Sequence, residues 1–177
     1  MAQTYCAAVR LGVDNWNQRY HDTEYGFPLS TDDELFERLI LEINQAGLSW
    51  LTILKKREGF TRAYDGFSVA KVAAYGEADR ARLLADAGIV RNRLKVNAAI
   101  ENARRIEAMG SFGDWLNERR GLALDAWAQE FKRTFLFTGG EIVREFLVST
   151  GYLPGAHDED CPIFQQSSVN HGTLSLL

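Results

Sequence analysis

The chain has 177 residues, of which 46% are hydrophobic and 25% charged, so it can bury a core of its own without disulfides. No apolar stretch is long enough to span a membrane, and the chain does not open with a basic segment followed by an apolar run, so we expect a cytoplasmic protein that binds no membrane. The net charge of −4 weighs against nucleic-acid binding, because affinity for a duplex comes largely from neutralising phosphates.

Helical periodicity recurs from one end of the chain to the other. The strongest predicted helix spans 31–46, where Thr31-Asp32-Asp33-Glu34 matches a capping box and apolar residues follow at helical spacing. Further helices are predicted at 15–24, at 49–57 closed by Gly59, and at 68–76, 78–87, 91–109, 114–120, 124–131 and 140–150. No stretch alternates with the period of a strand. The sequence therefore predicts an all-α fold, a single compact multi-helix domain over residues 1–165 with a tail at 166–177.

Basic residues are clustered although the net charge is negative. The clusters are Lys55–Arg57, Arg91–Lys95, Arg104–Arg105 and Lys132–Arg133. Clusters of this kind either solvate helix faces or contact phosphates. The charge pattern alone leaves both interpretations open.

Both cysteines and two of the three histidines suggest a metal site. The four residues are Cys6, His21, His157 and Cys161. His157 and Cys161 stand four residues apart, so a helix or tight loop can present both to one ion, whereas only the fold can bring Cys6 and His21 to them. From the residues alone, a thiol nucleophile beside a histidine and a disulfide between the chain ends remain alternatives to zinc.

A carboxylate lies at the margin of an apolar helix face. At 100° per residue, Glu42 falls near the azimuth of Leu35 on the predicted helix 31–46, where a carboxylate is partly desolvated. Its neighbours Tyr20, Tyr25 and Trp50 are suited to stacking a flat base. The alternatives are a salt-bridge role for Glu42 and a core role for the aromatic residues.

Three segments resemble the signature blocks of the 3-methyladenine DNA glycosylase I family. Tyr20–Pro28 reads YHDTEYGFP and is similar to the family's YHDxEWGxP, with Tyr25 in place of Trp. Leu35–Trp50 contains LFE, LE and QAGLSW at the family's spacing, and Asp86–Lys95 reads DAGIVRNRLK. The resemblance extends over roughly Tyr20 to Arg105 and is too dense to be a chance match.

This resemblance implies a fold of the helix-hairpin-helix glycosylase superfamily whose termini are tied by one structural zinc ion (Zn2+) per chain. The family's zinc ligands fall on Cys6, His21, His157 and Cys161. Its base-reading glutamate falls on Glu42, which makes Glu42 the expected catalytic residue. The expected base-binding residues are Tyr20, Tyr25 and Trp50.

The resemblance also implies a function. We expect a monomeric DNA repair enzyme that flips alkylated purines, chiefly 3-methyladenine, out of double-stranded DNA and hydrolyses the N-glycosidic bond, leaving an abasic site. The residues expected to grip phosphates are Lys132, Arg133, Gly139 and Gly140.

Two rival functions remain. Departures from the family pattern at Ala8, Tyr25 and Arg144 motivate the alternative of a catalytically inactive, zinc-stabilised module that binds alkylated DNA. A zinc hydrolase would need an open coordination position, which a set of four protein ligands does not leave.

Overall fold

The computed structural model describes residues 4–12 and 14–167. Within these ranges every regular element is a helix and no strand occurs, so the all-α prediction is confirmed. The elements are α1 (Tyr5–Arg10), α2 (Asn15–Thr23), α3 (Asp32–Gln45), α4 (Trp50–Ala63), the 3-10 helix η1 (Asp65–Phe67), α5 (Val69–Ala73), α6 (Glu77–Ala85), α7 (Arg93–Met109), α8 (Phe112–Asn117), α9 (Leu124–Thr134) and α10 (Gly140–Ser149). None of these helices combines the length and the apolar character needed to cross a bilayer.

The chain divides into two compact units. The central unit comprises residues 30–144, and the terminal unit comprises residues 1–29 and 145–177. Helix α10 contributes to both, because the division falls between Arg144 and Glu145. The predicted boundary between a domain at 1–165 and a tail stays a prediction, and residues 168–177 of that tail lie outside the described residues.

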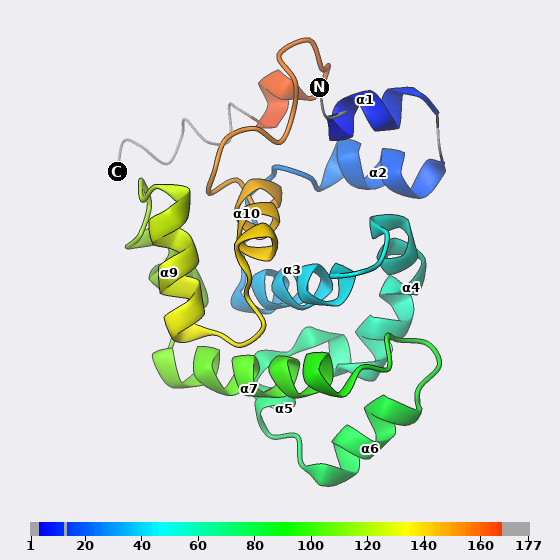
Figure 1. Ribbon diagram of the computed structural model, residues 1–177, viewed down its shortest axis with the longest axis vertical. Coiled ribbons are helices and arrows are strands. Elements are labelled where there is room, and N and C mark those ends of the chain that lie inside the picture. The colour runs from blue at the N-terminus through cyan, green and yellow to red at the C-terminus, as the bar shows by residue number, and fades with distance from the viewer. Residues whose placement is uncertain (1–3, 13, 168–177) are drawn as a thin grey trace. The chain divides into compact units, whose positions relative to one another are not determined.

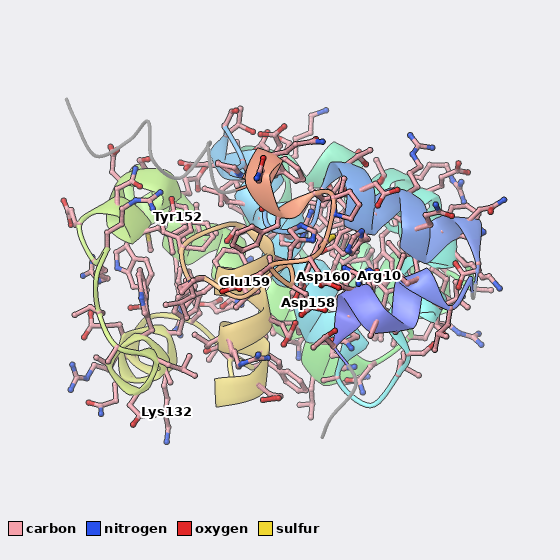
Figure 2. The ribbon with its side chains drawn as sticks, turned by 90° about the horizontal axis from the view of Figure 1, so that it is seen from above. Arg10, Lys132, Tyr152, Asp158, Glu159 and Asp160 are labelled. Carbon is pink, nitrogen blue, oxygen red and sulfur yellow. The ribbon has the colours of Figure 1, made fainter. Side chains whose placement is uncertain are left out.

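In the terminal unit, helices α1 and α2 lie beside the segment that follows α10 (Figure 1). Arg10 at the end of α1 donates two hydrogen bonds to the carboxylate of Asp160, at 2.7 and 3.0 Å, and these two residues lie side by side in Figure 2. At the start of α1, the Thr4 hydroxyl donates to Asp158 at 2.7 Å. Both ends of this short helix are therefore fastened to the C-terminal segment.

Helix α3 forms the centre of the central unit. Its first turn carries the predicted capping box, in which Thr31 accepts from the Glu34 amide and the Glu34 carboxylate accepts from the Thr31 amide. Its predicted apolar face is buried, with Leu39 and Ile40 at 0% exposure. The Asp32 carboxylate accepts from the backbone amides of residues 112 and 113 at 2.9 and 2.8 Å, which fastens the start of α8 to α3.

The predicted end of α4 is wrong. The helix runs through Gly59 and ends at Ala63. Gly59 is buried, and a Cβ at this position would lie 2.5 Å from the carbonyl oxygen of Gly88. Glycine is present because two backbone segments meet there, and this requirement has nothing to do with helix termination.

Helix α7 confirms its predicted inward face. Val96, Ile100 and Ile106 are at most 1% exposed. The helix begins at Arg93, two residues later than predicted, because the Asn92 side chain caps it by accepting from the amides of Leu94 and Lys95. The sequence patterns did not predict α1 or η1, which are only six and three residues long.

Candidate metal centre and base-binding residues

The four predicted metal ligands meet in the terminal unit. Cys6 lies on α1, His21 lies on α2, and His157 and Cys161 follow α10. All four side chains are buried, and their potential ligand atoms lie within 4.8 Å of one another. This buried Cys2His2 group can bind a metal ion.

The distances between these atoms suit a tetrahedral ion. His21 Nε2 lies 3.2 Å from Cys6 Sγ and 3.2 Å from His157 Nδ1. Cys161 Sγ lies 3.7 Å from His21 Nε2 and 3.8 Å from His157 Nδ1, and Cys6 Sγ lies 3.7 Å from His157 Nδ1. Zinc bonds of about 2.0–2.3 Å to nitrogen and sulfur give ligand separations of about 3.3–3.8 Å around a tetrahedron. The donor set and its spacing therefore fit zinc.

Hydrogen bonds outside the group orient the two imidazoles. His21 Nδ1 donates to Asp22 at 2.7 Å, and His157 Nε2 donates to the Tyr25 carbonyl at 2.7 Å. These bonds leave Nε2 of His21 and Nδ1 of His157 as the unprotonated nitrogens that face the group. The Asp158 amide donates to Cys6 Sγ at 3.3 Å, which favours a thiolate at that position.

The two cysteines are free and buried, so the predicted alternative of a disulfide does not hold in this structure. Burial raises the pKa of the Cys6 thiol to about 11 and lowers the pKa of the His157 imidazole. A thiol with a raised pKa is a poor nucleophile at neutral pH, whereas a metal cation can displace its proton. The raised pKa of Cys6 thus weighs against nucleophilic catalysis, and the close spacing of the four ligand atoms favours metal binding.

Gly26 allows the C-terminal segment to approach the ligands. Its φ is +81°, and a Cβ there would lie 2.5 Å from the Cβ of Ala156, next to His157. Its amide donates to the Ser149 carbonyl at 2.9 Å. The sequence pattern marks Gly26 only as the exit from the predicted helix 15–24, because its contact with Ala156 is distant in the chain.

The predicted base-binding residues are divided between the units. Tyr20 and Tyr25 belong to the terminal unit, where they are buried with ring centroids 5.8 Å apart. Glu42 and Trp50 belong to the central unit, on α3 and at the first position of α4. The Glu42 side chain is only 4% exposed, so the predicted burial of this carboxylate is confirmed, while its role stays a prediction.

Several residues of the basic clusters have partners inside the central unit. Lys95 is buried and donates to the carbonyls of Asn44 and Ala46, so its ammonium is not open to a phosphate. Arg57 pairs with Glu37 at 2.8 Å, and Lys56 donates to the Ala87 carbonyl at 2.9 Å. The charge clusters were visible in the sequence, but their carbonyl and carboxylate partners are distant in the chain.

The loop between α9 and α10, residues 135–139, borders a shallow open groove of about 690 Å3. Lys132, Gly139 and Gly140 line this groove, whereas Arg133 does not and pairs with Glu130 at 2.9 Å. A Cβ at either glycine would meet open space. The fold itself therefore does not require glycine at these positions.

This arrangement of helices is that of solved 3-methyladenine DNA glycosylases. A solved structure of 3-methyladenine DNA glycosylase I from Staphylococcus aureus, which describes how that protein recognises 3-methyladenine, aligns with a TM-score of 0.79 and 32% identity, over 92% of this chain and 97% of that chain. DNA-3-methyladenine glycosylase of Haemophilus influenzae is 33% identical over 166 residues, 81% of this chain and 89% of that protein. DNA-3-methyladenine glycosylase 1 of Escherichia coli (strain K12) is 48% identical over 95 residues, 54% of this chain. That match spans about half of the E. coli protein, 51% of its length.

The methyladenine glycosylase family matches residues 11–121, which is more than half of the chain. The chain belongs to this family. The resemblance read from the three sequence blocks is thereby confirmed, and so is the predicted class of enzyme, a glycosylase.

Proposed function

We propose that the protein hydrolyses the N-glycosidic bond of alkylated purines, chiefly 3-methyladenine, in double-stranded DNA and leaves an abasic site. The observation that carries this proposal is the buried carboxylate of Glu42 within the region that matches the family. In a buried, low-dielectric setting a carboxylate interacts strongly with a cation and with a hydrogen-bond donor, and an adenine methylated at N3 offers both in its positive charge and its exocyclic amine.

The positive charge also explains why little further catalytic machinery is needed. A cationic base is already a good leaving group, so the protein has to flip the base, select it and stabilise the sugar cation as the bond breaks. In this proposal Glu42 accepts from the exocyclic amine and favours the cationic ring over neutral adenine. Trp50, Tyr20 and Tyr25 supply aromatic faces for the flipped base.

We propose that the Cys2His2 group binds one zinc ion with a structural role. Cys6, His21, His157 and Cys161 would complete a tetrahedral shell, which leaves no position for a substrate or a water molecule. The ion supplies a positive charge that stabilises both thiolates. Metal analysis of protein purified without chelators is expected to give about one zinc per chain, and protein without metal would contradict this proposal.

We propose that α9, residues 135–139 and α10 form a helix-hairpin-helix that grips DNA phosphates. Lys132 is exposed at the groove, and Gly139 and Gly140 leave the backbone open to close approach at the start of α10. Backbone amides at a helix N-terminus bind phosphate without reading sequence. Arg133, which is also exposed, would add charge beside the groove.

One assay tests the proposed activity. Duplex DNA treated with a methylating agent is incubated with the protein, and the released bases are separated by chromatography. Free 3-methyladenine, released about tenfold or more slowly by the Glu42→Gln variant, is the expected result. Binding of the methylated duplex without any released base would instead identify the protein as an inactive module for alkylated DNA.

A further inference from the structure

Two buried polar side chains share one face of α7. Lys95 and Asn102 are seven residues apart, which brings them back to nearly the same azimuth after two turns, about 10 Å further along the axis. Lys95 is 5% exposed and Asn102 is 0% exposed. Buried polar groups are costly unless they are hydrogen-bonded, so the partners of these two side chains show what they do.

Lys95 holds the turn between α3 and α4. Its ammonium donates to the carbonyl oxygens of Asn44 at 2.8 Å and Ala46 at 2.6 Å, where α3 ends. A cation at a helix C-terminus is favoured by the helix dipole. The turn over residues 46–49 lies between Glu42 and Trp50, so Lys95 fixes the connection between the two residues proposed to read the base.

Asn102 holds the loop between α9 and α10. Its side-chain amide donates to the Leu136 carbonyl at 3.0 Å, and its side-chain oxygen accepts from the Leu136 amide at 2.8 Å. Next to it, Phe137 has a φ of +61°, a left-handed conformation that is costly for a residue with a side chain. The reciprocal bonds of Asn102 help to hold the loop in this strained form.

The two loops are also connected to each other. The Lys95 ammonium lies 5.9 Å from the centroid of the Phe137 ring, within the range of a cation–π contact. Both loops expose large apolar side chains, Leu48 at 41% and Phe137 at 38%. One face of α7 therefore sets the spacing between the turn at 46–49 and the loop at 135–139.

We propose that Lys95 and Asn102 are positioning residues for the reaction, because they align the loop that grips DNA with the turn that carries the base-reading residues. This inference rests on the proposed function. Neither side chain needs to touch DNA. Lys95 acts through the geometry of Glu42 and Trp50, and Asn102 acts through the loop at 135–139.

The test compares Lys95→Met and Asn102→Ala with Lys71→Met, a control that removes an exposed charge from α5. For Lys95→Met we expect kcat for 3-methyladenine release to fall about tenfold or more, with Kd for an unmodified duplex unchanged, because base alignment is lost after binding. For Asn102→Ala we expect the Kd for any duplex to rise about fivefold or more. Lys95→Arg keeps the positive charge and can still donate to both carbonyls, so its kcat is expected to lie between those of Lys95→Met and the wild type.

Amide hydrogen exchange supplies a readout that does not depend on activity. Exchange is expected to quicken at residues 46–49 in Lys95→Met and at Leu136 in Asn102→Ala, while the core of α7 stays protected. If the wild type releases no base, the proposed activity fails, and the exchange data alone decide whether α7 holds the loops. If both variants match Lys71→Met in exchange, kcat and Kd per folded molecule, the positioning role is overturned.

Discussion

The central unit buries apolar side chains from α3 and α7, whereas the terminal unit buries a cluster of four potential metal-ligand side chains. The helices α1 and α2 have six and nine residues, too few to form a large apolar core of their own. A metal ion can replace such a core, because its binding free energy becomes folding free energy. The two units should therefore respond differently to the same perturbation.

Loss of the metal is expected to have the largest effect, and to be confined to the terminal unit. Cys161→Ser removes one thiolate, and in the proposed zinc site this should speed amide exchange in α1 and α2 by orders of magnitude, since such sites contribute up to about 10–16 kcal/mol in small peptides. Helices α3 and α7 should stay protected. Glu159→Gln, which changes an exposed residue of the same segment, is the control. Equal exchange in the two variants would show that the terminal unit does not need the metal.

The converse perturbation is Gly59→Ala. A Cβ 2.5 Å from the Gly88 carbonyl forces α4 away from that backbone, so we expect the central unit to lose about 1–3 kcal/mol of stability. Metal content should be unchanged. Chemical denaturation measures the free energy of unfolding, and metal analysis measures the metal content per chain. Gly76→Ala is the control, because a Cβ there meets open space. A variant as stable as wild type would mean that the Gly59–Gly88 contact relaxes at no cost.

Glu42→Gln separates activity from stability within the central unit. The variant keeps the shape of the side chain but loses its charge, and excision of 3-methyladenine should fall about tenfold or more, since a charged hydrogen bond is worth on the order of 1.5–3 kcal/mol. The variant should stay folded, because glutamine keeps the shape and volume of the side chain. Glu58→Gln, exposed on α4, is the control. A variant that unfolds, while its folded fraction excises normally, would make Glu42 a structural residue.

The smallest expected effect concerns the acid dependence of α3. Hydrogen bonds from the amides of Ser30 and then Thr31 lower the pKa of the Glu34 carboxyl. The resulting stabilisation is fully present above the unfolded pKa of about 4.3 and is lost as the pH falls through the lower folded value. Glu34→Gln should reduce stability by under about 1 kcal/mol at neutral pH and flatten its decline in acid. Urea denaturation of the wild type and the variant, from neutral pH to below the unfolded pKa, measures both effects. If the stability of the variant falls with acid as steeply as that of the wild type, the prediction is contradicted.

The parts of the fold that could be predicted from the sequence are those that depend on neighbours in the chain. The start of α3 follows from Thr31 and Glu34, which are three residues apart, and its buried face follows from helical spacing. His157 and Cys161 were recognisable as a pair for the same reason. Their association with Cys6 and His21 required the family resemblance, because the fold alone brings them together.

The errors concern residues whose partners are distant in the sequence. Gly59 was interpreted as a helix end, but its reason is Gly88, and no local pattern reveals such a contact. Lys95 was grouped with its basic neighbours, but its partners are carbonyls at the end of α3. A charged side chain looks the same in the sequence whether it faces solvent or a helix terminus.

The interrupted chain of the terminal unit has a consequence for the order of folding. Its two segments are separated by the whole of residues 30–144, so closing them costs the entropy of a very long loop while the central unit is unfolded. The central unit is continuous and can fold as soon as it has been synthesised. Once folded, it should shorten the effective loop, so we expect closure of the terminal unit to be the last step. If the proposed zinc ion binds there, this is the step whose rate should depend on the zinc concentration.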